Sequence, residues 1–406
     1  MSFRYATLPN GLRIVMCHTP GSPAEMCGLA VNAGSRDEDP AQHGLAHFVE
    51  HTVFKGTRNR RAWHINNRME AIGGELNAYT TKEETFIYST FPAGAAHLDR
   101  AAELIADLVM NSVFPETEID REREVVCDEI SSYLDVPSEG VFDDFDDLIY
   151  ARSSLGHNIL GTVQSVTSLG SEACRRWLSE LYTPGCMVFF YTGPQTPDKV
   201  HRTALRRFGA LNHPDRHRGR PVPPATDPFC ITRDISCHQA HTVTGARIPG
   251  LLDENRTATA LAVNVIGGPG MNSLLNVALR EKRGLVYSID ASTSLLSNAG
   301  LMTVYYGCDH ADTLRCRRLV SDILDRMASE GLTERRLEAA KRQYLGQLQV
   351  AGANQENVIL AAARATLHRG RALESEETAE RVMAVTPDAL RAAVAPFTLT
   401  STLTLR

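Results

Sequence analysis

The feature that most constrains this chain is a polar, proline-rich segment near its middle. Residues 212–228 contain five prolines and show neither a helical nor a strand period. Such a segment cannot continue a packed element, so it separates the residues before it from those after it. The length of 406 residues also suits two domains. We therefore expect domains at residues 1–211 and 229–406, joined by a linker at 212–228.

The two halves resemble each other at an offset of about 215 residues. The matching positions are a strand end at Phe91 and Cys308, a helical stretch at 104–108 and 319–323, and a helix start at Thr117 and Thr333. Expected strands and helices alternate within each half. The sequence therefore predicts two similar domains of the α+β class.

Composition excludes several classes of protein. Lys and Arg number 42 against 48 Asp and Glu, a net charge of −6, which argues against a general nucleic-acid binder. No apolar run reaches the ~18–20 residues that span a bilayer, and the N-terminus shows no secretory signal. The nine cysteines have irregular spacing, which is typical of reduced thiols. We expect a cytoplasmic protein with no nucleic-acid or membrane partner.

The most informative motif lies in residues 43–51, where a helix is expected. His47 and His51 at i and i+4 project from one helix face, with Glu50 beside them. Two imidazoles at this spacing can hold a zinc ion, and the carboxylate can take a proton from water. The pattern H-x-x-E-H is the inverted zincin signature. The alternative is two histidines that are solvated or satisfied in the core.

A catalytic zinc needs a third protein ligand. Glu122 and Glu129 are seven residues apart on an expected helix, so they share a face. Apolar residues at 125–127 indicate that this helix is partly buried. The alternative is a surface helix with i, i+4 ion pairs, which accounts for Arg121, Arg123 and Glu124 but less well for Glu129.

Together these residues resemble the pitrilysin/insulinase family of inverzincin zinc metallopeptidases. The flanking segments Gly44–Phe48, Phe54–Thr57 and Gly73–Ala78 are also similar to family sequences. The likeness is to half-size members, such as the subunits of mitochondrial processing peptidase and bacterial homologues. It implies two similar α+β domains, each an antiparallel β-sheet with packed helices, as in processing peptidases and LuxS.

The resemblance also implies a role for each motif residue. His47, His51 and Glu129 would bind one Zn²⁺ per chain. Glu50 would be the general base, and Glu122 an accessory carboxylate that orients a ligand histidine. The spacing from His51 to Glu129 is slightly longer than is usual in the family.

The second half supplies a further candidate pair. Residues 280–287 are similar to the family segment R-E-x-x-G-L-x-Y. The resemblance implies that Arg280 and Tyr287 reach the zinc site from the C-terminal domain and bind the substrate carbonyl and the developing oxyanion. From the residues alone, the alternative is a helix that ends at Gly284 and a packed tyrosine. This half has no H-x-x-E-H, so we expect it to support catalysis without a zinc site.

A strand expected over residues 75–81 is the candidate for substrate binding. It resembles the family's edge strand, to which an extended peptide can add through main-chain hydrogen bonds. We expect Asn77 and Ala78 to contact the substrate, together with Phe48 on the histidine helix. The alternative for the strand is simple core packing.

The expected function is that of a zinc-dependent endopeptidase. It would hydrolyse peptides or small unfolded polypeptides in a chamber between the domains. Alternatives are a maturation protease for one peptide precursor, or a structural or regulatory subunit of a heterodimer. Family members of this length pair, which implies a homodimer or a heterodimer with a related subunit.

Overall fold

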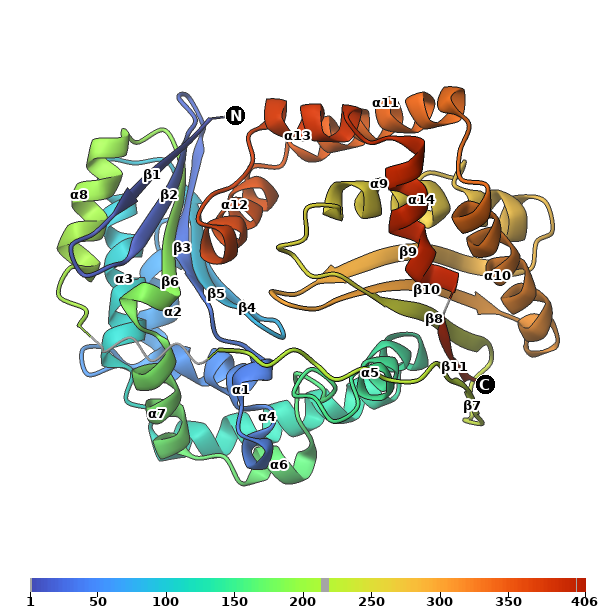
Figure 1. Cartoon of the computed structure of the whole chain (residues 1–406). Coiled ribbons are helices and arrows are strands. Elements are labelled where there is room, and N and C mark those ends of the chain that lie inside the picture. Colours follow the sequence, from blue (N-terminus) through green and yellow to red (C-terminus); the bar gives the residue numbers. More distant parts are fainter. Residues whose placement is uncertain (1, 213–218, 399) are drawn as a thin grey trace. The chain divides into compact units, whose positions relative to one another are not determined.

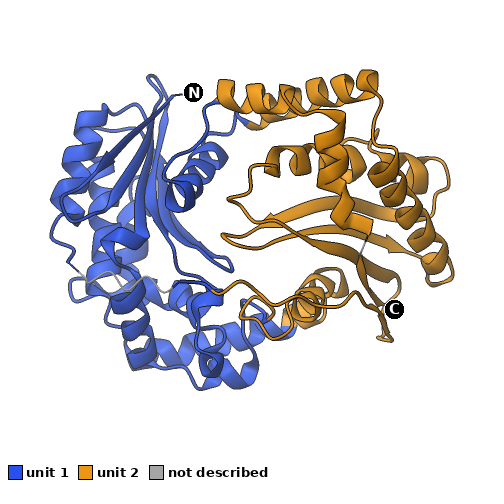
Figure 2. Ribbon diagram, viewed as in Figure 1, with its two compact units in different colours: residues 1–131, 157–220, 352–374 blue, residues 132–156, 221–351, 375–406 orange. Residues whose placement is uncertain are grey.

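The computed structural model describes residues 2–212, 219–398 and 400–406. They form two compact units, coloured separately in Figure 2. Unit 1 comprises residues 1–131, 157–220 and 352–374, and unit 2 comprises residues 132–156, 221–351 and 375–406. The expected linker at 212–228 lies in part, at 213–218, outside the described residues. The expected division into residues 1–211 and 229–406 differs from the observed units, which are not continuous in sequence. Residues 132–156, from the first half of the chain, belong to unit 2, and residues 352–374, from the second half, belong to unit 1.

Unit 1 is built on a six-stranded sheet (Figure 1). Its strands are β1 (Phe3–Thr7), β2 (Arg13–His18), β3 (Ala24–Val31), β4 (Glu75–Thr80), β5 (Thr85–Pro92) and β6 (Met187–Gly193). Their order is β1-β2-β6-β3-β5-β4, and every pair is antiparallel except β2 and β6. β4 is therefore an edge strand of this sheet.

The helices of unit 1 cover both faces of its sheet. They are α1 (Leu45–Thr52), α2 (Ala62–Glu70), α3 (His97–Asn111), α4 (Glu116–Leu134), α6 (Val163–Thr167), α7 (Ser171–Leu181), α8 (Pro197–Phe208) and α12 (Gln355–Arg369). Side chains alternate along the strands, so Ile14 and Met16 of β2 pack in the core with α3 and α8. Val15 and Cys17 face the opposite side and pack against α12.

Unit 2 is built on a five-stranded sheet. Its strands are β7 (Cys230–Arg233), β8 (Ala240–Ile248), β9 (Val286–Leu295), β10 (Gly300–Cys308) and β11 (Ser401–Leu405). Its helices are α5 (Pro137–Ile149), α9 (Arg256–Gly267), a π-helical turn (Asn276–Glu281), α10 (Thr313–Ser329), α11 (Glu334–Ala351), α13 (Ser375–Met383) and α14 (Pro387–Val394). α9, α10 and α14 share one core with the sheet, whereas α5 packs on its other face.

The two sheets share one topology. Strands β2 to β6 have the order β2-β6-β3-β5-β4, and strands β7 to β11 have the order β7-β11-β8-β10-β9. In both, the first and last strands pair in parallel and the other pairs are antiparallel. The prediction of two similar α+β domains is confirmed, each sheet being antiparallel apart from that one pair. None of the helices in the described part of the chain combines the length and apolarity needed to cross a membrane.

Candidate metal centre

The metal motif lies on α1, whose N-terminus is held by a buried carboxylate. Glu38 accepts hydrogen bonds from the backbone N–H groups of Gly44 (2.9 Å) and Ala46 (2.8 Å). These donors have no partner within the helix, so a carboxylate there stabilises its first turn. Gly44 has a φ of 93°, and a Cβ on it would lie 2.6 Å from the carbonyl oxygen of Leu160. Glycine is therefore required where the chain enters this helix.

The two histidines of α1 project from one face, as predicted for i and i+4. Their ring centroids lie 4.5 Å apart. Burial, together with the neighbouring His51, lowers the pKa of His47 to about 3. His47 is therefore a neutral imidazole near pH 7, which is the form that binds a metal. Its Nδ1 is buried and has no hydrogen-bond partner among the described residues.

A carboxylate from α4 completes a three-ligand cluster. Oε2 of Glu129 lies 3.7 Å from Nε2 of His47 and 3.5 Å from Nε2 of His51. Ligand atoms of the three residues all lie within 4.8 Å of one another. Two imidazole nitrogens and one carboxylate oxygen are a donor set that suits a catalytic zinc ion with an open position. The residues present therefore fit the metal that the sequence pattern predicts.

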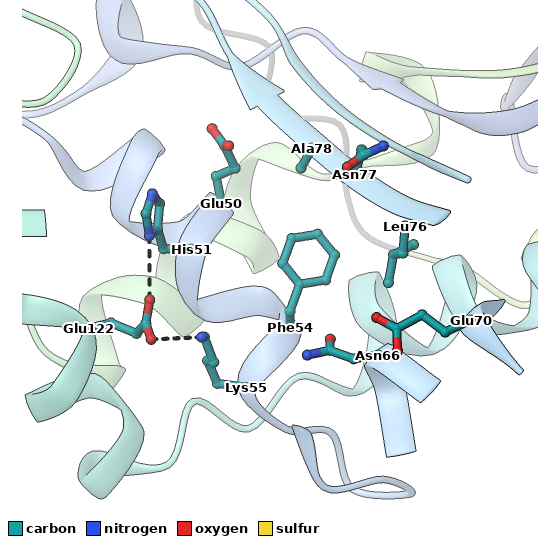
Figure 3. A pocket seen from close by; sticks show the side chains of 10 residues that line it. All are labelled: Glu50, His51, Phe54, Lys55, Asn66, Glu70, Leu76, Asn77, Ala78 and Glu122. Carbon is teal, nitrogen blue, oxygen red and sulfur yellow. Dashed lines mark hydrogen bonds and ion pairs between the residues drawn. The ribbon is translucent and has the colours of Figure 1, made fainter. Parts of the chain in front are cut away.

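Glu122, two turns before Glu129 on the same face of α4, lies behind the ligand cluster. Its Oε2 is 3.4 Å from Nδ1 of His51, and its Oε1 is 2.7 Å from Nζ of Lys55 (Figure 3). The side chain is largely buried, with 9% exposed. A carboxylate at Nδ1 holds the proton on that nitrogen and leaves Nε2 free to face Glu129. This is the position expected of the accessory carboxylate.

Glu50 lies on the β4 side of α1 (Figure 3). Burial raises the pKa of its carboxyl group, and the polar groups of Thr80 and the charge of His51 offset part of that rise. A carboxylate with a raised pKa is a better proton acceptor near neutral pH.

A cavity of about 400 Å³ opens between α1, α2 and β4. From α1 and the turn after it, Glu50, His51, Phe54 and Lys55 line the cavity. The other walls are Asn66 and Glu70 of α2, Leu76, Asn77 and Ala78 of β4, and Glu122 of α4. The candidate base, one candidate ligand and the edge strand therefore share one cavity (Figure 3).

The expectation for Phe48 requires correction. Phe48 is fully buried in the core of unit 1 and does not line the cavity, so it cannot contact a substrate there. Successive helical residues point about 100° apart, so the neighbour of a site-facing histidine turns toward the core. Phe54 supplies the aromatic wall instead.

Arg280 and Tyr287 belong to unit 2, whereas the residues of the cluster belong to unit 1. Arg280 is on the π-helical turn and Tyr287 is at the start of β9. Tyr287 is 61% exposed, and its hydroxyl donates a hydrogen bond to Asp309 (3.2 Å). That hydrogen bond raises the pKa of the phenol. The substrate-binding role of Arg280 and Tyr287 stays a prediction.

Sequence reasoning missed five residues that line the cavity, one of which, Leu76, lies in the strand that was expected to bind substrate. Phe54 and Lys55 belong to a segment that is similar to family sequences, but the similarity implies no role for either side chain. Asn66 and Glu70 stand at i and i+4 on α2, a spacing that indicates a shared helix face. That spacing could have identified the face, but only the packing of α2 beside β4 shows that it lines the cavity.

Comparisons with known proteins bear on both halves of the chain. A family model described as insulinase (peptidase family M16) matches residues 13–163, and one described as peptidase M16 inactive domain matches residues 168–344. An uncharacterized zinc protease of Streptomyces coelicolor is 34% identical over 400 residues, covering 96% of this chain and 86% of that protein. Another, from Bacillus subtilis, is 31% identical over 346 residues, covering 85% and 83%.

Solved structures share the fold. A protease from Helicobacter pylori has a TM-score of 0.91 at 19% identity, covering 100% of this chain and 99% of that chain. A structure from Pseudomonas fluorescens, described as a peptidase M16 inactive domain, has a TM-score of 0.92 at 16% identity, covering 100% and 98%. Models of one family thus match both halves, and a 34% identical relative spans nearly the whole chain. The chain belongs to the insulinase family, peptidase family M16.

Proposed function

We propose that the protein is a zinc-dependent endopeptidase that uses Glu50 as its general base. One observation carries the proposal. The cavity beside the His47–His51–Glu129 cluster is lined by Glu50 and by an edge strand of the sheet. Proton acceptor, metal ligands and a backbone that can pair with a peptide are therefore neighbours.

The substrate would bind along the outer edge of β4. The inner edge of this strand pairs with β5, and β4 is the last strand of its sheet. An extended peptide added to the free edge gains main-chain hydrogen bonds with little demand on its sequence. Asn77 and Ala78 would flank the peptide, while Phe54 and Leu76 offer an apolar wall to one of its side chains. The substrate class is therefore an extended or unfolded polypeptide.

Each residue of the cluster would have a distinct task in amide hydrolysis. His47, His51 and Glu129 would hold the metal, and Glu122 would orient His51 through Nδ1. Zinc, when bound, polarises the scissile carbonyl and makes water more acidic. The Glu50 carboxylate would accept a proton from the attacking water and return it to the leaving amine nitrogen.

The test is zinc content and peptide cleavage in the wild type and in Glu50→Gln. The variant keeps all three ligands, so we expect about one zinc per chain in both proteins. We expect cleavage of a mixed pool of unstructured peptides by the wild type and its loss in the variant. Glu124→Gln is the matched control, since Glu124 is an exposed carboxylate on α4 that does not line the cavity.

The outcomes separate the alternatives. Cleavage of many unrelated peptides supports a general oligopeptidase, whereas one efficiently cut peptide supports a maturation protease. Zinc binding without cleavage by either protein points to a required partner subunit. Wild-type levels of cleavage by Glu50→Gln would refute the assignment of the base.

A further inference from the structure

Unit 1 contains a second cavity that is distinct from the candidate metal centre. It has a volume of about 320 Å³ and is formed by α2, α3 and the turn before α2. Its lining includes Arg60, His64, Asn67, Arg68, Ala71 and Arg100. None of the described residues that line it carries a carboxylate. The cavity is therefore a cationic hollow in a chain whose net charge is −6.

α2 separates this cavity from the catalytic one. Asn66 and Glu70 face the catalytic cavity, whereas His64, Asn67 and Arg68 face the cationic one. At about 100° per residue, these two sets point in different directions around the helix. The two cavities therefore do not belong to one continuous site.

Carboxylates of α3 hold two of the arginines of the cavity in place. Arg60 bonds to Asp107 and to Glu103 at 2.5 Å each, and Arg68 bonds to Glu103 at 3.0 Å. Asp107 also accepts hydrogen bonds from Thr57, Asn59 and Asn111. Glu103 and Asp107 therefore hold the guanidinium groups of Arg60 and Arg68 and are not among the residues that line the cavity.

One arginine at the cavity is unpaired. Arg100 has no side-chain hydrogen bond or ion pair with any residue that the structure describes, although it lines the cavity. Its Nε is buried, so a ligand in the cavity would meet the terminal Nη groups. A guanidinium group without an internal partner is available to an anion that enters the cavity.

We propose that this cavity binds a small anion with two or more phosphate groups, of the class of pyrophosphate. Guanidinium groups present paired N–H donors that match phosphate oxygens. Arg68 and Arg100 supply such donors from two adjacent helices, and the cavity volume lies within the range of small-molecule sites. His64 and Asn67 add further polar groups to the wall.

The test is a calorimetric titration of the full-length protein with pyrophosphate, with citrate as a carboxylate comparison. Two variants probe the cavity differently. Arg100→Gln removes the guanidinium group that lacks an ion pair. Ala71→Glu adds a negative charge to the wall without removing any contact that supports the fold. Arg61→Gln is the control, because Arg61 is exposed at the start of α2 and does not line the cavity.

We expect saturable pyrophosphate binding by the wild type and by Arg61→Gln. Both cavity variants should weaken it by roughly 10- to 100-fold, the effect of losing one charge-assisted contact. Three results would overturn the proposal: no binding by the wild type, equal weakening in Arg61→Gln, or citrate bound as tightly as pyrophosphate. Binding is measured without cleavage, so the result does not depend on the proposed peptidase function.

Discussion

At the scale of single residues, Glu122 is the side chain whose role is most open to test. It lies behind His51, with Lys55 on its other oxygen. Glu122→Ala should weaken zinc binding by about 10- to 100-fold, because Nδ1 of His51 loses the carboxylate that fixes its tautomer. Competition with a chromophoric chelator measures this affinity. Glu124→Ala, an exposed neighbour on α4, should leave it unchanged. Equal zinc affinity in wild type and Glu122→Ala would show that the carboxylate does not orient the ligand.

Local geometry explains which site residues could be predicted from sequence. His47 and His51 share a helix face at i and i+4, and Glu122 and Glu129 share one at i and i+7, so helical spacing alone groups each pair. That the two pairs lie together, one on α1 and one on α4, was predicted only from the family resemblance, because no local sequence pattern determines this contact. Phe48 was misplaced because a residue next to His47 points about 100° away from the histidine face, and here that direction leads into the core.

At the scale of elements, the buried carboxylate of Glu84 connects the turn between β4 and β5 to α12. Oε1 of Glu84 is 2.6 Å from Nε2 of His368 and 3.0 Å from Nε of Arg364. Burial alone would raise the pKa of Glu84, but the hydrogen bond from His368 and the charge of Arg364 lower it to about 2. The pKa is thus lower in the folded than in the unfolded chain, where it is about 4.3. The resulting stabilisation is present above that value and is lost as pH falls from about 4 to about 2.

Glu84→Gln should therefore lower the free energy of unfolding near pH 7 by on the order of 3 kcal/mol. The difference from the wild type should shrink as the pH falls through that window. Urea denaturation at a series of pH values measures it. Glu172→Gln, which alters an exposed carboxylate on α7, should show little difference at any pH. A difference for Glu84→Gln that stayed constant down to pH about 2 would contradict the ion-pair origin of this stabilisation.

The element types and the repeat could be predicted from the sequence, but the helix that covers the second face of each sheet could not. The continuous apolar run along β2 indicates a strand buried on both faces, and the offset of about 215 residues correctly aligns α3 with α10 and α4 with α11. No local pattern shows that α12, from the second half of the chain, covers β2, β3 and β6. α5, from the first half, likewise covers β8 and β11. Such contacts depend on long-range packing.

At the scale of the whole molecule, this exchange determines which segments can fold alone. The face of the unit 1 sheet under α12 is apolar, and Phe86, Val188 and Phe190 are buried there. Each such side chain gains about 1.5–3 kcal/mol from burial. A fragment of residues 1–211 lacks α12 and keeps α5 without the sheet that α5 covers. It would therefore expose two apolar faces that the intact chain buries.

The fragment 1–211 should accordingly bind a hydrophobic dye and self-associate, because large exposed apolar patches drive association. A peptide of residues 352–374, added in trans, should reduce both effects by restoring the helix on its sheet face. A peptide of residues 334–351 is the control, since α11 packs with α9 and α13 in unit 2. Dye fluorescence and analytical ultracentrifugation provide the two readouts. If the fragment were monodisperse and its dye binding did not change when the 352–374 peptide was added, residues 1–211 would be a folding unit by themselves. The exchanged helix would then be an addition to a domain that is already stable.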